Sequence, residues 1–105
     1  MIFENMGKTV KSTNWDSKRT DFLCRALLAI KTEGEMKNFM RDLMTPVEII
    51  EFGNRLEASR MLKDGVHYNA IIEKTGLSSR TIARVKKWLK GTGGGYRLVL
   101  SRLNK

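Results

Sequence analysis

The segment TGLSSRTIARVKKWLKG, residues 75–91, carries five basic side chains and no acidic one. Within it, Arg80, Arg84 and Lys87 recur every three or four residues, so on a helix they share one face. A guanidinium group can donate paired hydrogen bonds to a phosphate or to a guanine edge, and an ammonium group is a compact charge that suits phosphate. The row therefore indicates contact with a negatively charged partner.

Apolar residues of the same segment lie on the opposite side. Placed on a wheel of about 100° per residue, Ile82, Val85 and Leu89 form a stripe that faces away from the three basic residues. A helix running from Ser78 or Ser79 to about residue 90 would thus bury one face and expose the other. A basic helix face is often only solvated, so the surrounding pattern has to decide its meaning.

That surrounding pattern is a pair of short helices joined by a tight turn. A helix is expected over about 68–74, and Gly76 can take the positive φ that a sharp turn requires. Helix-turn-helix units clamp their two helices with apolar residues at fixed places and set the second helix in the major groove of DNA. The predicted clamp residues are Ile71, Ile72, Leu77, Ile82 and Val85.

The unit predicts contacts with double-stranded DNA. Arg80 and Arg84 suit a guanine edge or phosphates, and Thr81 and Ala83 suit a thymine methyl group. The serines at the helix start suit the DNA backbone, where helix amides add a partial positive charge. The expected DNA-contacting residues are Ser78, Ser79, Arg80, Thr81, Ala83, Arg84, Lys87 and Lys90.

Other helices are expected to position this unit. A stripe from Phe22 to Ile30 predicts a helix that Ser17 caps, and residues 33–44 predict a second, shorter one. Thr45, Pro46 and Glu48 form a capping box for a long helix that ends near residue 63. Inside this helix, Gly53 costs roughly 1 kcal/mol against Ala and indicates close packing.

The tail after the glycine-rich GTGGG predicts a last helix over 96–104, with an alternating strand as the alternative. The fold class is therefore all-α with about six helices. Residues 1–16 are expected to form a loosely ordered arm, and residues 17–105 a single domain, with 66–90 as the helix-turn-helix.

Charge is unevenly distributed along the chain. Residues 66–105 carry nine of the twenty basic residues and one of the eleven acidic ones, so +8 of the formal charge of +9 belongs to them. A concentrated basic surface gains affinity for nucleic acid by releasing condensed counterions. An anionic membrane surface is less well matched, because the helix faces offer few large apolar side chains to insert.

The remaining residue types limit the alternatives. The lone cysteine, Cys24, cannot close an internal disulfide, and we expect it to be a buried small side chain. The lone histidine, His67, cannot form a metal site with it and is expected in a turn or cap. No catalytic motif, cofactor site, signal peptide or membrane span is recognisable. We expect a cytoplasmic protein that is not an enzyme.

Residues 43–100, from LMTPVEII through TGLSSRTIARV to GGGYRLVL, resemble the YerC/YecD-like branch of the Trp repressor superfamily. The likeness extends over about residues 17–103. It implies an intertwined homodimer in which residues 17–64 and the last helix interlock with the partner. It also implies a sequence-specific DNA-binding transcriptional regulator that acts as a repressor.

The resemblance also implies a small-molecule pocket, whose matching residues are Thr45, Arg55, Arg84, Val85 and Trp88. In the tryptophan-binding protein the positions of Val85 and Trp88 carry Gly and Ser. Both replacements obstruct an indole, so L-tryptophan is not expected as the effector, and any other effector is unknown. On its own helix, Arg55 can instead pair with Glu51.

Two other functions fit parts of the sequence. The helix-turn-helix could be the DNA-binding module of a transposase or a replication initiator, although no catalytic domain accompanies it. The last helix could serve a helical protein-interaction module. A measurement of size and of salt-dependent DNA affinity separates these alternatives.

Overall fold

Helix α3, Pro46–Lys63, begins at the predicted capping box. Thr45 Oγ1 accepts a hydrogen bond from the Glu48 backbone N–H at 3.1 Å, and the Glu48 carboxylate accepts one from the Thr45 N–H at 2.9 Å. These bonds satisfy two N–H groups at the helix start. Asp64 is the C-cap residue of the helix, and Gly65 follows with a φ of 80°. The predicted bounds of the long helix are confirmed.

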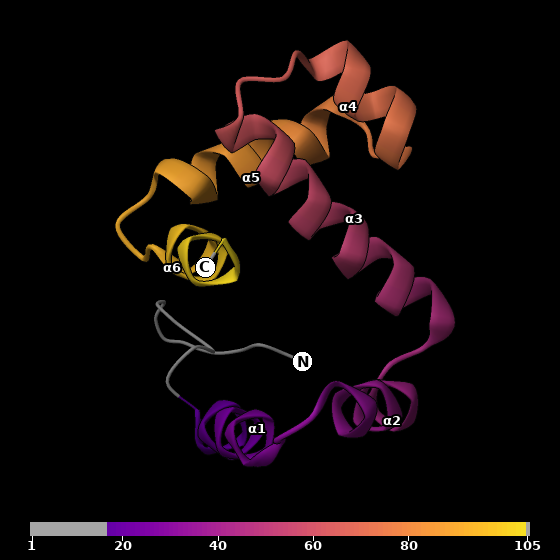
Figure 1. Cartoon of the computed structure of the whole chain (residues 1–105), viewed down its shortest axis with the longest axis vertical. Helices are drawn as coiled ribbons and strands as arrows, with labels where there is room; N and C mark the ends of the chain where they lie inside the picture. The colour runs from indigo at the N-terminus through magenta and orange to yellow at the C-terminus, as the bar shows by residue number, and fades with distance from the viewer. Residues whose placement is uncertain (1–16, 105) are drawn as a thin grey trace. The chain divides into compact units, whose positions relative to one another are not determined.

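The computed structural model describes residues 17–104, and every regular element in that range is an α-helix (Figure 1). The all-α fold is confirmed, whereas the arm expected over residues 1–16 lies outside the described residues. The strand alternative for the tail is wrong. The other helices are α1 (Lys18–Ala29), α2 (Glu33–Leu43), α4 (Tyr68–Thr75), α5 (Ser79–Lys90) and α6 (Gly95–Leu103).

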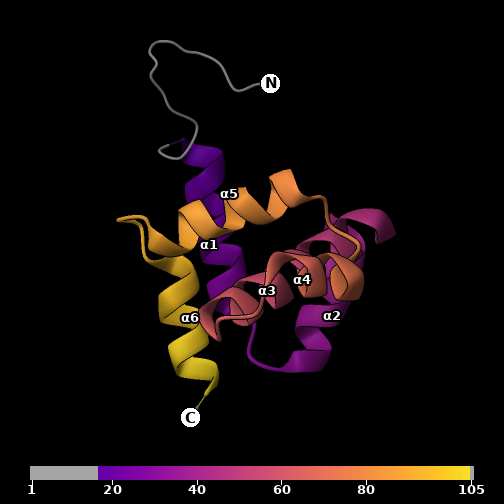
Figure 2. The ribbon, with the colours of Figure 1, turned by 90° about the horizontal axis from the view of Figure 1, so that it is seen from above.

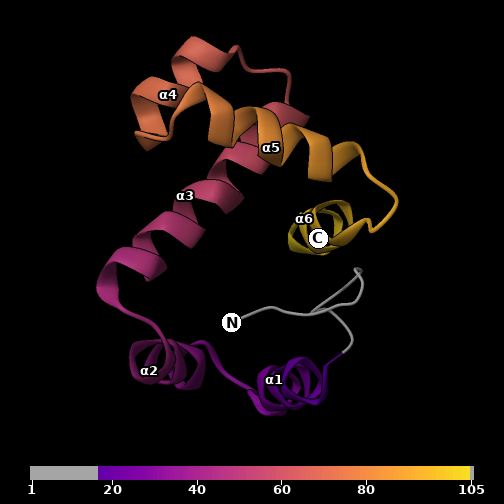
Figure 3. The same ribbon diagram turned by 180° about the vertical axis from the view of Figure 1, so that it is seen from behind.

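The chain divides into two compact units, Met1–Leu43 and Met44–Lys105. In the second unit α5 lies across α3, and α4 packs beside both (Figures 1 and 3). Ala58 of α3, Ile71 of α4 and Ile82 of α5 are fully buried and form the centre of the core. Each of the three helices therefore contributes one side chain to the buried cluster that packs them together.

Helix α6 follows α5 after a glycine-rich link and turns away from its end (Figure 2). Gly94, with a φ of 71°, occupies the N-cap position of α6. The Arg97 guanidinium donates a hydrogen bond to the backbone carbonyl of Leu89, near the end of α5. Leu100 is buried. These contacts hold α6 against α5 and α3.

In the first unit, Ser17 Oγ accepts a hydrogen bond from the Thr20 N–H at 3.0 Å, which confirms the predicted cap of α1. No residue of α1 or α2 is buried. Cys24 is exposed, so the expectation of a buried cysteine is wrong. The apolar spacing of α1 predicts a buried helix face, but the unit formed by α1 and α2 does not bury that face.

Gly53 is a second correction. A Cβ atom built at this position meets no heavy atom within 4 Å. The close packing expected around Gly53 is therefore not present within the described chain, and the glycine in α3 has no steric explanation there.

Candidate nucleic-acid interface

The turn between α4 and α5 is shaped by two neighbouring residues. Gly76 takes the left-handed conformation, with φ 75° and ψ 3°, and its N–H donates to the Ile72 carbonyl at 2.8 Å. The Thr75 hydroxyl donates to the Ile71 carbonyl at 2.7 Å and accepts from the Leu77 N–H at 3.2 Å. The predicted turn residue is confirmed, but the contribution of Thr75 was not predicted.

The buried face of α5 fixes the rotation of that helix. Ile82 is fully buried and Val85 is 2% exposed, whereas Leu89, one turn further on, is half-buried. Since both buried residues face the core formed with α3 and α4, α5 cannot rotate without exposing them. The predicted inward stripe thus sets the direction of the opposite face.

The opposite face of α5 is exposed and positively charged. Arg80, Arg84 and Lys87 are all exposed, and so are Ser79 and Ala83 between them. Within residues 17–104, none of the three basic side chains forms an ion pair or a hydrogen bond with another residue. Their charges are consequently available to an external anion.

Ser78 and Thr81 form the N-terminal cap of α5. Ser78 Oγ accepts a hydrogen bond from the Thr81 N–H at 3.1 Å and lies 3.1 Å from Thr81 Oγ1. Thr81 is half-buried. Both hydroxyl groups therefore have a structural partner, while Ser79 stays exposed at the first turn, where the helix amides carry partial positive charge.

Two further lysines of α5 lie outside the main row. Lys90, in the last turn, is exposed. The Lys86 ammonium lies 5.7 Å from the centroid of the Tyr68 ring of α4, within range of a cation–π interaction. Lys86 thus faces the neighbouring helix, and Lys90 extends the charged surface toward the glycine-rich link.

The structure places the five predicted pocket residues in different surroundings. Thr45 caps α3, Arg84 lies on the exposed face of α5 and Val85 is buried. Arg55 forms an ion pair with Glu51 on its own helix, which was the predicted alternative to a role in a pocket. Its guanidinium also lies 5.5 Å from the ring centroid of a neighbouring phenylalanine, Phe52, and its buried Nε has no hydrogen-bond partner in the described chain.

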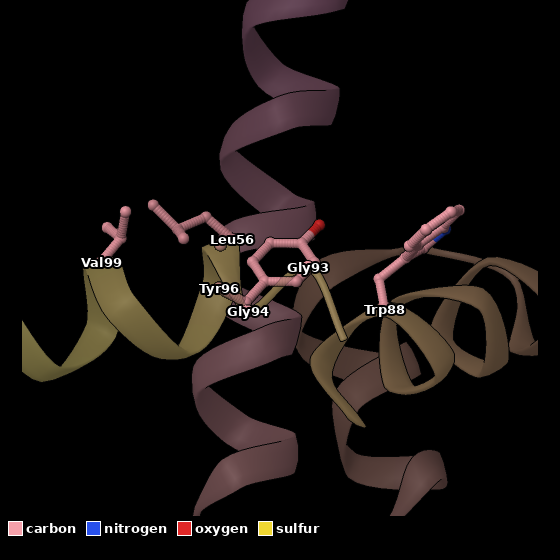
Figure 4. Close-up of a pocket in the computed structure, with 7 residues that line it drawn as sticks. Leu56, Trp88, Gly93, Gly94, Tyr96 and Val99 are labelled. Atoms are coloured by element: carbon pink, nitrogen blue, oxygen red, sulfur yellow. The ribbon is translucent and has the colours of Figure 1, made fainter. Parts of the chain in front are cut away.

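The fifth residue, Trp88, lines an apolar hollow, which we call the Trp88 hollow (Figure 4). Its volume is about 460 Å³, and Trp88 remains 55% exposed. Sequence reasoning missed this hollow, although Tyr96 and Val99 follow the glycine run at helical spacing. Its lining consists of Leu56, Trp88, Gly93, Gly94, Gly95, Tyr96 and Val99.

Other site types have less support in the described residues. Within residues 17–104, no three His, Cys, Asp or Glu side chains gather where they could hold a metal ion. His67 occupies the N-cap position of α4, but its side chain makes no capping hydrogen bond. Among the six helices, none combines the length and apolar character needed to cross a lipid bilayer.

An exposed basic helix, clamped behind a left-handed glycine turn, defines this chain as a helix-turn-helix protein. A model of the family described as Trp repressor protein matches residues 18–104. The chain belongs to the Trp repressor family, a family of DNA-binding regulators.

Similar proteins agree with this assignment. The uncharacterized protein YerC of Bacillus subtilis (strain 168) is 38% identical over 88 residues, which cover 84% of this chain and 85% of YerC. A TrpR-like protein from Eubacterium eligens ATCC 27750 has a crystal structure that superposes with a TM-score of 0.81 at 34% identity, covering 86% of this chain and 93% of that one. The crystal structure of a candidate Trp repressor from Staphylococcus aureus gives 0.80 at 32% identity, with coverage of 89% and 96%.

Proposed function

We propose that this protein is a transcriptional repressor that binds specific double-stranded DNA as a homodimer. The observation that carries the proposal is the exposed face of α5. There, Arg80, Arg84 and Lys87 have no partner among residues 17–104, while Ile82 and Val85 anchor the opposite side. In the major groove, the two arginines would read base edges or hold phosphates, and Lys87 would bind phosphate. The proposal of repression, as opposed to activation, is supported by the description of the family as Trp repressor protein.

Exposed apolar side chains support the homodimer. Phe22 of α1, Ile50 of α3 and Leu103 of α6 are 69%, 64% and 68% exposed, and ten other large apolar residues are exposed with them. At roughly 150–250 Å² for a large side chain, the exposed area is on the order of 1,000 Å². Stable interfaces need about 800 Å² per partner, so a second copy can account for this surface.

Binding to L-tryptophan is not part of the proposal. Val85 is a buried residue of the core, and Arg55 is held by Glu51 and Phe52, so neither is free to form the walls of an indole site. Trp88 occupies a position where the tryptophan-binding protein has a small side chain. We therefore expect the protein to bind DNA in the absence of L-tryptophan.

The proposal is tested by selecting bound sequences from random DNA with the purified full-length protein. We expect enrichment of a two-fold symmetric site with half-sites about one helical turn apart. Light scattering on the complex should give two copies per site. Recovery of unselected DNA with no enriched sequence would contradict a sequence-specific regulator.

Calorimetric titration with L-tryptophan, in the presence and absence of that DNA, tests the effector. We expect no saturable heat and no change in DNA affinity. Saturable binding in the micromolar range would contradict this part of the proposal.

A further inference from the structure

The basic side chains on the exposed face of α5 lie at different heights along the helix. Arg80 belongs to the first turn, Arg84 lies one turn later, and Lys87 follows after nearly another turn. At a rise of about 1.5 Å per residue, Arg84 lies about 6 Å and Lys87 about 10 Å beyond Arg80 along the helix axis. A recognition helix contacts base edges with its N-terminal residues. Arg80 is therefore the basic side chain of α5 that lies nearest to the bases.

The first turn of α5 holds the backbone of Arg80 in place. Ser78 Oγ accepts a hydrogen bond from the Thr81 N–H, directly after Arg80, at 3.1 Å. Ile82, two residues after Arg80, is fully buried. Arg80 itself is exposed and forms no ion pair or hydrogen bond with another of the residues that the structure describes. A long side chain on a rigid turn can be aimed at a base with the accuracy that paired hydrogen bonds require.

The neighbours of Arg80 are either engaged in the cap or short. Ser78 Oγ and Thr81 Oγ1 lie 3.1 Å apart, and Thr81 is half-buried. Ser79 and Ala83 are exposed, but their side chains extend only one or two atoms from the backbone, so they leave the base edge open to a longer side chain. Within residues 78–83, Arg80 thus combines reach, charge and the absence of a partner in the described chain.

We propose that Arg80 determines the sequence specificity of the protein by contacting one guanine in each half-site, whereas Arg84 and Lys87 bind phosphates. The inference rests on the sequence-specific regulator of the proposed function and assigns the reading of a base to one side chain. Guanine presents two acceptors, N7 and O6, in the major groove, and a guanidinium can donate one hydrogen bond to each. Phosphate contacts position a protein on the duplex but carry no sequence information directly. A change of Arg80 should therefore alter which sequences are bound, and a change of Arg84 should alter only how tightly they are bound.

Selection from random DNA, carried out in parallel with variants, tests the assignment. Glutamine pairs with N6 and N7 of adenine, much as arginine pairs with guanine. For Arg80→Gln we expect one position of each half-site to change from guanine to adenine, while the other positions stay as in the wild type. Arg84→Gln is the matched control, because it makes the same chemical change one turn further along, and it should enrich the wild-type sequence with lower affinity. Retention of that guanine by Arg80→Gln, or its loss in Arg84→Gln, overturns the inference.

Replacement of this guanine by 7-deazaguanine tests the contact itself, because the modified base keeps its pairing with cytosine but lacks the N7 acceptor. In one half-site, the replacement should lower the affinity of the wild type at least about fivefold, measured by fluorescence anisotropy at a salt concentration where all variants bind. Its effect on Arg80→Ala should be less than about twofold, whereas Arg84→Ala should show the full loss. Such non-additivity between a base and a side chain identifies a direct contact. Equal losses in all three proteins would refute the contact.

The outcomes separate the inference from the function on which it rests. A wild-type protein that enriches no sequence contradicts the sequence-specific regulator itself. A wild-type protein that enriches a site whose base preferences persist in Arg80→Gln leaves the regulator intact and excludes the role of Arg80. Urea unfolding checks the fold of the variant: we expect the midpoint of Arg80→Gln to equal that of the wild type, and a lower midpoint would show that the fold itself uses this side chain.

Discussion

Arg80 and Arg84 differ from three other arginines of the second unit in what their guanidinium groups meet. Arg55 and Arg60 each pair with a glutamate of α3, and Arg97 donates to the Leu89 carbonyl. Arg80 and Arg84 have no such partner in the described residues. Truncating either one therefore removes a group that the fold does not use, so a loss of DNA affinity can be assigned to the DNA contact.

We expect Arg80→Ala and Arg84→Ala each to weaken binding to the selected site by about 1–3 kcal/mol. Combined, the two changes should cost at least about 2 kcal/mol, or about 30-fold in affinity, measured by fluorescence anisotropy. Lys63→Ala, which alters an exposed lysine of α3, should change affinity by less than about twofold, because surface charges away from the interface act weakly. Unchanged affinity of the double variant at about 100 mM salt would refute the assignment.

Gly76 is constrained by its backbone and not by its neighbours. Its φ is 75°, yet a Cβ atom at this position would meet no heavy atom within 4 Å. Gly76→Ala should therefore cost about 1–2 kcal/mol of unfolding free energy, the penalty of a left-handed L-residue. Asn tolerates this conformation better, so Gly76→Asn should lose less in urea unfolding. Equal losses for both variants would point to a steric cause instead.

At the scale of helices, the boundaries were largely predictable because their signals are local. Ser17, Thr45 and Ser78 each accept a hydrogen bond from an N–H three residues later, which a short sequence window specifies. The two faces of α5 were predictable for the same reason, since residue spacing alone sets them. The Arg97–Leu89 bond was not predictable, because it joins two helices across a glycine-rich link.

A substitution at Gly53 can show whether another helix packs against this part of α3. Because the position is open within the chain, Gly53→Ala should raise the free energy of unfolding by roughly 0.5–1 kcal/mol through helix propensity alone. The measurement is urea unfolding at several protein concentrations. A loss of stability, accompanied by weaker dimerisation, would instead show that a partner helix passes close to Gly53.

Glu57 links α3 to α4. Its carboxylate accepts two hydrogen bonds from Arg60, at 2.6 and 2.7 Å, and lies 3.9 Å from the Lys74 ammonium of α4. The Arg60 hydrogen bonds, and to a lesser degree the charges of Arg60 and Lys74, lower the pKa of Glu57. Since the folded pKa lies below the unfolded one, this stabilisation is complete above the unfolded value and is lost as pH falls through the folded value.

Glu57→Gln should accordingly lower the urea midpoint at about pH 7. The difference from the wild type should shrink as the pH is lowered, because protonation of Glu57 in the folded protein removes the same stabilisation. Glu33→Gln is a suitable control, because the Glu33–Lys37 pair at 3.2 Å is strongly exposed and joins residues of one helix. Such pairs contribute little, so its pH dependence should match the wild type. Parallel curves for Glu57→Gln and wild type would contradict the pKa assignment.

For the whole molecule, the sequence spacing predicted which apolar residues share a helix face, but it did not predict which segment covers that face. The stripe containing Phe22 and Leu27 was recognisable in the sequence, yet its exposure in one chain follows from the small size of its two-helix unit. The Trp88 hollow was missed because three helices and a glycine-rich link form it together. Both features depend on contacts between distant segments or copies, which no local pattern encodes.

The uneven charge of the chain allows the number of copies on DNA to be measured from salt dependence. Each phosphate contact contributes about −0.9 to the slope of log affinity against log salt concentration. If two copies bind, Lys87→Ala removes two contacts, and the slope should become less steep by about 1.8. The same change in Lys63, away from α5, should leave the slope within error of the wild type. A change of only about 0.9 for Lys87→Ala, at concentrations that saturate the site, would mean that one copy contacts the DNA and would contradict the dimeric complex.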